Sequence, residues 1–174
     1  GQHALGASTT GCQNIAIGTT ALGAATIGIC NIAIGANAMS GVTTGSAQDN
    51  IAIGKCALVG AAGTNGNENI AIGMNAADAL TTGEVNVAIG RNAYGTAQAG
   101  LYNVAVGDVA MGGSLVAGNN NIAIGKNAAD ALLAGACNIA MGINAYGTAE
   151  AGENNVAIGN TAMGACLVTG AANV

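Results

Sequence analysis

The chain has very few charged or aromatic residues. Its 174 residues include three basic and eight acidic ones, three Tyr, and no Phe, Trp or Pro. With a net charge of −5, it lacks a basic patch to hold phosphates, so we expect no binding to nucleic acid or to an anionic membrane surface. Asn and Gly interrupt every apolar run before it reaches transmembrane length, so we also expect no membrane insertion.

What the chain does contain is a short repeat. The string Asn-Ile-Ala-Ile-Gly first occurs at 14–18 and returns with conservative changes at spacings of 17 to 19 residues, and a last copy breaks off after Val174. A short fixed period indicates a stack of equivalent structural units. We therefore interpret residues 1–174 as a single repeat array, cut in mid-repeat at both ends and belonging to a longer fibre.

Each copy of the motif predicts a short strand and a turn. Ile15, Ala16 and Ile17 alternate with the period of a strand, and Gly18 allows a tight bend after it. A Gly-x-x-Ala segment follows, which we expect to return as a second strand. The sequence thus predicts an all-β protein, a parallel β-solenoid of about nine to ten coils with 17–19 residues each.

Both faces of the predicted strand are apolar, so each needs a cover. We expect the Ile and Val row to fill the inside of each coil and the Ala row to form a flat outer face, on which copies of the chain pack as a homotrimer. The predicted oligomer face consists of Ala16, Ala33, Ala52, Ala71, Ala88, Ala105, Ala123, Ala140 and Ala157.

The Asn that begins each copy is a candidate structural residue. In a stack of coils, its amide can bond to the equivalent amide of the next coil, whereas the alternative is an ordinary turn residue. The predicted ladder consists of Asn14, Asn31, Asn50, Asn69, Asn86, Asn103, Asn121, Asn138 and Asn155.

Candidates for chemistry are few. His3 is the only histidine, and no Cys-x-x-Cys pair, phosphate-binding loop or calcium loop is present, so we expect no enzyme activity, metal or cofactor. A hexapeptide-type acyltransferase, which would use His3 as a base, is a remote alternative. A disulfide between two cysteines of adjacent coils stays open; the five cysteines are Cys12, Cys30, Cys56, Cys137 and Cys166.

A longer period of 52 residues overlies the short one. It relates Tyr94 to Tyr146, for which we expect packing at a coil edge, with a sugar-stacking contact as the alternative. It also relates Asp78 to Asp130, which lie three coils apart and therefore form no carboxylate pair.

The charged residues test the alignment of the coils. Lys55, Arg91 and Lys126 each follow the motif Gly directly, and Asp108 takes the same position in the coil between those of Arg91 and Lys126. Coils stacked in register would therefore place Asp108 between two cations.

The motif resembles the head repeat of YadA-like trimeric autotransporter adhesins, Asn-x-Val-Ala-Ile-Gly with a small residue shortly after, and similar repeats in bacteriophage tail fibres. The resemblance covers the whole chain and implies a trimeric, left-handed parallel β-roll on a surface fibre. Coils of 17 to 19 residues that carry Cys favour the phage type. The expected function is a rigid fibre segment of a virion or cell-surface appendage, whose other parts bind a receptor or glycan; the alternative is a bacterial adhesin head that binds matrix or host glycans.

Overall fold

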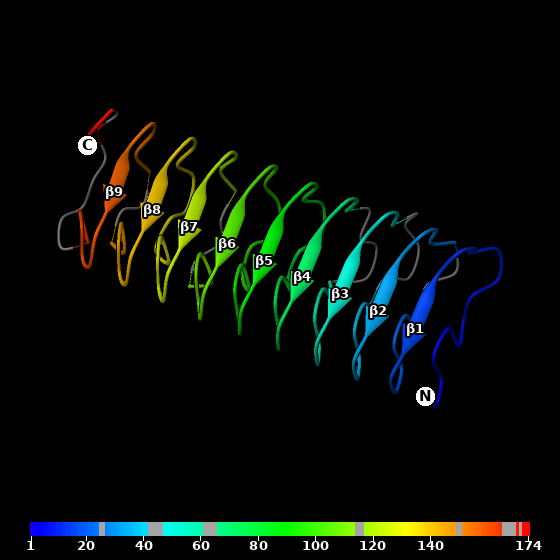
Figure 1. The fold of residues 1–174 in the computed structure, drawn as a ribbon. Helices are drawn as coiled ribbons and strands as arrows, with labels where there is room; N and C mark the ends of the chain where they lie inside the picture. Colours follow the sequence, from blue (N-terminus) through cyan, green and yellow to red (C-terminus); the bar gives the residue numbers. More distant parts are fainter. Residues whose placement is uncertain are drawn as a thin grey trace.

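The computed structural model describes residues 1–24, 27–41, 47–60, 66–113, 117–148, 151–164, 170 and 172–174. Within them, nine three-residue strands form one sheet in sequence order, and all neighbours are parallel (Figure 1). The two chain termini lie at opposite ends of the row of strands. The strands are β1 (Ile15–Ile17), β2 (Ile32–Ile34), β3 (Ile51–Ile53), β4 (Ile70–Ile72), β5 (Val87–Ile89), β6 (Val104–Val106), β7 (Ile122–Ile124), β8 (Ile139–Met141) and β9 (Val156–Ile158).

The register of the sheet follows the repeat. At every step the central Ala of one strand pairs with the central Ala of the next, as in Ala71 with Ala88. Two backbone bonds frame each step: Ile70 N donates to Asn86 O over 2.8 Å, and Gly90 N donates to Ile72 O over 2.8 Å. The prediction of an all-β parallel solenoid is therefore confirmed.

The motif Gly ends each strand because no other residue fits there. These glycines have φ between 127° and 140°, a region that side chains strongly disfavour. Space is missing as well, since a Cβ on Gly73 would collide with the carbonyl oxygen of Gly90 in the next repeat.

The expected second strand in the Gly-x-x-Ala segment is wrong. That segment forms consecutive tight turns, in which Ala93 N donates to Gly90 O over 3.4 Å and Gly95 N donates to Asn92 O over 3.2 Å. Among the described residues, the only further β-pairing consists of isolated bridges two residues before the motif Asn, such as Glu84 with Leu101. The returning half of each coil bends too often to extend, since Asn92 and Tyr94 both have positive φ.

The assignment of the strand faces is also wrong. The central Ala side chains point into the coil, and from Ala33 to Ala157 they are at most 1% exposed, whereas the first and third strand residues point outward. The interior is completed by the returning segment, whose Ala is followed by a larger buried residue such as Met39, Tyr94 or Met111. A strand residue larger than Ala would overpack this thin interior.

Two repeats fill the interior differently. Where Ala77 or Ala129 takes the place of the larger residue, Leu80 or Leu132 of the same coil is buried instead. The buried Leu thus fills the interior volume that the small Ala leaves, as close packing requires.

Candidate functional site

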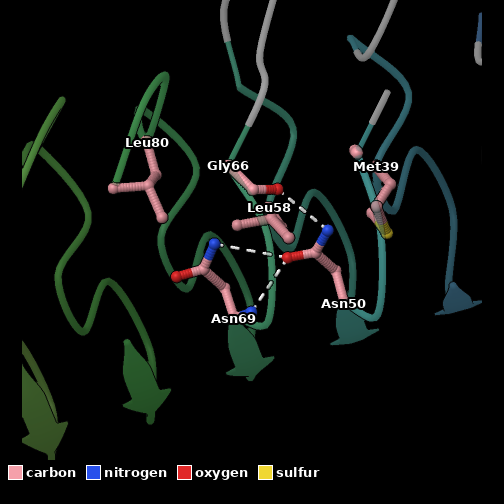
Figure 2. A pocket seen from close by; sticks show the side chains of 7 residues that line it. Met39, Asn50, Leu58, Gly66, Asn69 and Leu80 are labelled. Carbon is pink, nitrogen blue, oxygen red and sulfur yellow. Dashed lines mark hydrogen bonds between the residues drawn. The ribbon is translucent and has the colours of Figure 1, made fainter. Parts of the chain in front are cut away.

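The predicted Asn ladder is present along the whole sheet. Oδ1 of each motif Asn accepts the backbone N–H of the next motif Asn over 2.9 to 3.0 Å, from Asn14 through to Asn173. Nδ2 donates to the carbonyl three residues before the next motif Asn, as from Asn50 to Gly66 over 3.0 Å. The side chains also bond to each other, as from Asn69 Nδ2 to Asn50 Oδ1 over 3.2 Å (Figure 2). The residues from Asn31 to Asn155 are at most 2% exposed.

The ladder is a structural element and leaves no room for a ligand. Figure 2 shows Asn50 and Asn69 beside Met39, Leu58 and Leu80, which line an internal cavity of about 10 Å³. A cavity of this size is at the lower limit for a single water molecule.

The two tyrosines of the long period belong to the ladder. Tyr94 Oη accepts from Asn103 Nδ2 over 2.9 Å, and Tyr146 Oη accepts from Asn155 Nδ2 over 2.8 Å. Both side chains are at most 1% exposed, and burial raises the pKa of both phenols. The sugar-stacking alternative is therefore wrong for these two residues; Tyr102, which is 56% exposed, lies outside the ladder.

The Ala row does not form an oligomer face. Eight of its members are buried inside the chain, and Ala16 in β1 is half-buried, so no second chain can reach the row. The row consists of Ala16, Ala33, Ala52, Ala71, Ala88, Ala105, Ala123, Ala140 and Ala157. The physical cause is the narrow interior, which accepts only a methyl group from the strand.

The outward side of the sheet is a continuous row of apolar side chains along all nine strands. We call it the aliphatic face. None of its side chains is fully buried, and Ile17, Ile53, Ile89 and Ile158 are 57%, 36%, 37% and 67% exposed. With nine strands about 4.8 Å apart and a width of roughly 10 Å, its area is on the order of 400 Å². It consists of Ile15, Ile17, Ile32, Ile34, Ile51, Ile53, Ile70, Ile72, Val87, Ile89, Val104, Val106, Ile122, Ile124, Ile139, Met141, Val156 and Ile158.

Charged residues border the aliphatic face as the alignment predicts. Arg91 Nε and Nη2 donate to the two carboxylate oxygens of Asp108 over 2.9 and 2.7 Å. The hydrogen bond from Arg91 is the main cause that holds the pKa of Asp108 below its usual range, and Lys126 on the other side lowers it further. The placement of Asp108 between two cations is confirmed.

The histidine and the cysteines form no common site in the part of the chain that the structure describes. His3 is exposed in the first turn of the chain, and Cys12, Cys30, Cys56 and Cys137 are free thiols, so no bond joins Cys12 to Cys30. Cys30 Sγ instead donates to Gln13 Oε1 over 3.2 Å. Cys166 lies outside the described residues. Within the described ranges, no group of three or more His, Cys, Asp or Glu residues lies together as a metal site would require, and no helix is long and apolar enough to cross a membrane.

One open cleft lies away from the aliphatic face. It has a volume of about 250 Å³, spans the segments that follow β4, β5 and β6, and is lined by Asp78, Asn92, Gly95, Thr96, Val109 and Gly112. Burial raises the pKa of the Asp78 carboxyl, and that of Asp130 in the equivalent position of the later repeat. The period of 52 residues relates these two aspartates to each other, but nothing in the sequence alone indicates a cleft.

Comparisons with known proteins add no relative: no family model, curated protein or solved structure matches the chain.

Proposed function

We propose that the chain is a structural segment of a trimeric surface fibre, in which the aliphatic faces of three copies pack around a common axis. The observation that carries the proposal is the aliphatic face itself. A continuous apolar patch of this size is as large as the largest patch on a typical monomer, and such patches are often contact surfaces. Burial of about 400 Å² corresponds to roughly 10 kcal/mol of transfer free energy per chain, before the cost of association.

The charges at the two ends of a strand support a parallel, cyclic arrangement. Exposed Asp49 precedes β3 and exposed Lys55 follows it. When parallel copies surround an axis at the same height, the end of a strand in one copy faces the beginning of the same strand in the next. Lys55 of one copy then faces Asp49 of its neighbour, a pairing of opposite charges that fixes height and direction.

The fibre segment fits the resemblance of the motif to YadA-like adhesin heads and phage tail fibres, which implies three copies and left-handed coils. About nine to ten coils would make a rod on the order of 45 Å long. We propose a location on a virion or cell surface, where the rod holds a receptor-binding part of the fibre at a distance. The bacterial adhesin head remains the alternative.

The number of copies is measured by native mass spectrometry and analytical ultracentrifugation. We expect a species of three times 16.4 kDa. Asp in place of Ile53, Ile89 and Ile124 should give a monomer with an unchanged circular dichroism spectrum. The matched control places Asp at three exposed positions outside the face, Thr82, Gln98 and Ala134, and should remain trimeric.

A parent protein that is monomeric or dimeric at micromolar concentration would overturn the trimer. The place of the fibre is tested separately, with gold-labelled antibodies against residues 1–174. Labelled tail fibres on particles support the leading proposal, and labelled bacterial envelopes select the adhesin.

A further inference from the structure

The cleft beside β5 arises from a gap in one column of side chains. Five residues after the motif Gly, successive repeats carry Asp78, Gly95 and Gly112, and then Asp130 begins the same order again. Neither glycine places a side chain beside the aspartate. A Cβ on Gly95 would be in van der Waals contact with Asp78 Oδ1 at 3.4 Å, so the carboxylate borders the cleft, whereas a Cβ on Gly112 would collide with the backbone carbonyl oxygen of Asn92.

The polar groups of the cleft are held in place by neighbouring coils. Asn75 Nδ2 donates to Asn92 Oδ1 over 3.2 Å. This bond fixes the side-chain amide of Asn92, so that Asn92 Nδ2 is the donor in the cleft. Thr96 Oγ1 donates to Gly112 O over 3.1 Å at the exposed rim. The cleft therefore offers a carboxylate acceptor and an amide donor in fixed positions, beside the apolar side chain of Val109.

The cleft chemistry selects among classes of ligand. The lining contains no cation, and the nearest one in sequence, Arg91, is bound to Asp108 through two hydrogen bonds, so phosphates and other anions are disfavoured. A single carboxylate is a poor site for Ca²⁺, which takes six to eight oxygen ligands. Neutral hydroxyl groups suit the cleft, because they donate to Asp78 and accept from Asn92 at the same time.

The arrangement is built twice. Residues 52 positions later repeat it as Asp130, Asn144, Gly147, Thr148 and Gly164, with Thr161 in place of Val109. The contacts repeat as well: Asn127 Nδ2 donates to Asn144 Oδ1 over 3.1 Å, Thr148 Oγ1 donates to Gly164 O over 3.1 Å, and a Cβ on Gly147 would lie 3.5 Å from Asp130 Oδ1. Three strand spacings of about 4.8 Å place the two positions roughly 14 Å apart.

We propose that Asp78 with Asn92, and Asp130 with Asn144, form two equivalent binding positions for sugar residues of a neutral glycan that lies along the solenoid. The carboxylate accepts hydrogen bonds from ring hydroxyls, the amide donates to a third oxygen, and the glycine gap admits the ring. The positions lie on a single chain away from the aliphatic face, so the inference does not depend on the number of copies.

The test is a printed array of neutral oligosaccharides of glucose, galactose, mannose and N-acetylglucosamine, probed with the labelled chain, with heparin fragments as anionic probes. We expect retention on at least one neutral series and none on heparin. Asp78→Asn with Asp130→Asn removes both charges at constant shape and should weaken retention about tenfold or more. Gly95→Ala with Gly147→Ala narrows both binding positions and should do the same.

The control removes two charges elsewhere. Glu68→Gln with Glu153→Gln alters exposed residues before β4 and β9 and should bind as the parent does. Circular dichroism verifies the fold of each variant, and the aspartate variant decides alone if the glycine variant misfolds. Absence of retention on every neutral series, or equal retention by the parent and the aspartate variant, would overturn the proposal. The mass measurement of the trimer is independent of either result.

Discussion

Asn69 lies in the middle of the Asn ladder and offers the sharpest test of what holds the coils together. Its side chain is 1% exposed and takes part in four hydrogen bonds. Oδ1 accepts from the backbone N and from Nδ2 of Asn86 over 3.0 and 3.1 Å. Nδ2 donates to Asn50 Oδ1 over 3.2 Å and to Gly83 O over 2.9 Å. The perturbation is Asn69→Ala, which removes all four.

The expected loss follows from the groups left behind. Asn86 Nδ2 keeps its bond to Gly100 O, and Asn50 Oδ1 keeps the backbone N–H of Asn69. The backbone N–H of Asn86 and the carbonyl of Gly83 lose these partners in the interior, at about 1–3 kcal/mol each. With the small cavity added, we expect the free energy of unfolding to fall by about 3–5 kcal/mol.

Asn69→Asp separates hydrogen bonding from packing. The new carboxyl keeps the shape and the acceptor but turns an oxygen toward Gly83 O, and its charge is buried without a counter-charge. Burial raises the pKa of this carboxyl above its unfolded value, so stability should decline as the pH rises through the folded pKa and recover in acid. Loss of packing alone would give no such pH dependence.

The assay is urea unfolding followed by circular dichroism at constant protein concentration, because assembly shifts apparent stability. Hydrogen exchange read by mass spectrometry adds the location: protection should fall around β3 to β5 and persist around β8, since repeats couple to their neighbours. The control is Asn160→Ala, at an exposed Asn outside the ladder. Equal unfolding midpoints for the two Ala variants would refute the stabilising role of the ladder.

Two further predictions concern titratable groups. Tyr94→Phe removes an acceptor of Asn103 and should lower the free energy of unfolding by about 1 kcal/mol. Because burial raises the pKa of Tyr94, the parent should also lose stability as the pH rises above about 10, and the variant should lose less. The control Tyr102→Phe, at an exposed site, should leave both the stability and its dependence on pH as in the parent. Burial likewise raises the pKa of Asp78 and Asp130, so their contribution to stability is complete below about pH 3.9 and declines as the pH rises through the folded pKa. Asp78→Asn with Asp130→Asn should flatten that decline when the free energy of unfolding is measured in urea at several pH values. A plot of this free energy against pH that runs parallel to the parent's would contradict the burial.

Features that depend on the repeat alone could be predicted from the sequence. Strings as similar as those around Ala71 and Ala88 pair in register, because a shift would place a strand residue against a turn. Once the register is set, the neighbours of Asp108 follow, and so does the contact of each motif Asn with the next. These predictions needed no knowledge of how the coil closes.

Features that depend on the closure of a coil could not be predicted. Val85 and Val109 adopt positive φ, which β-branched residues strongly disfavour, and nothing in their neighbourhood signals it. The cleft could not be predicted for a similar reason. Asp78, Gly95 and Gly112 are 17 residues apart along the chain, and the glycines look like turn residues until the coils are aligned in one column.

The prediction interchanged the two faces of the strand. The alternation of Ile or Val with Ala shows that the strand has two different faces, but it does not show which face lies inside the coil. Size normally decides, and Ile would be placed in the core. Here the returning segment supplies the large interior residues, such as Met111 and Tyr94, so the strand can contribute only the methyl group of Ala105. The larger residues of the strand must then face outward, at a cost that a single chain in water does not recover. The physical reason for the proposed assembly therefore lies in the Ile and Val row and not in the Ala row, and it is stronger there, because the apolar area to be covered is larger.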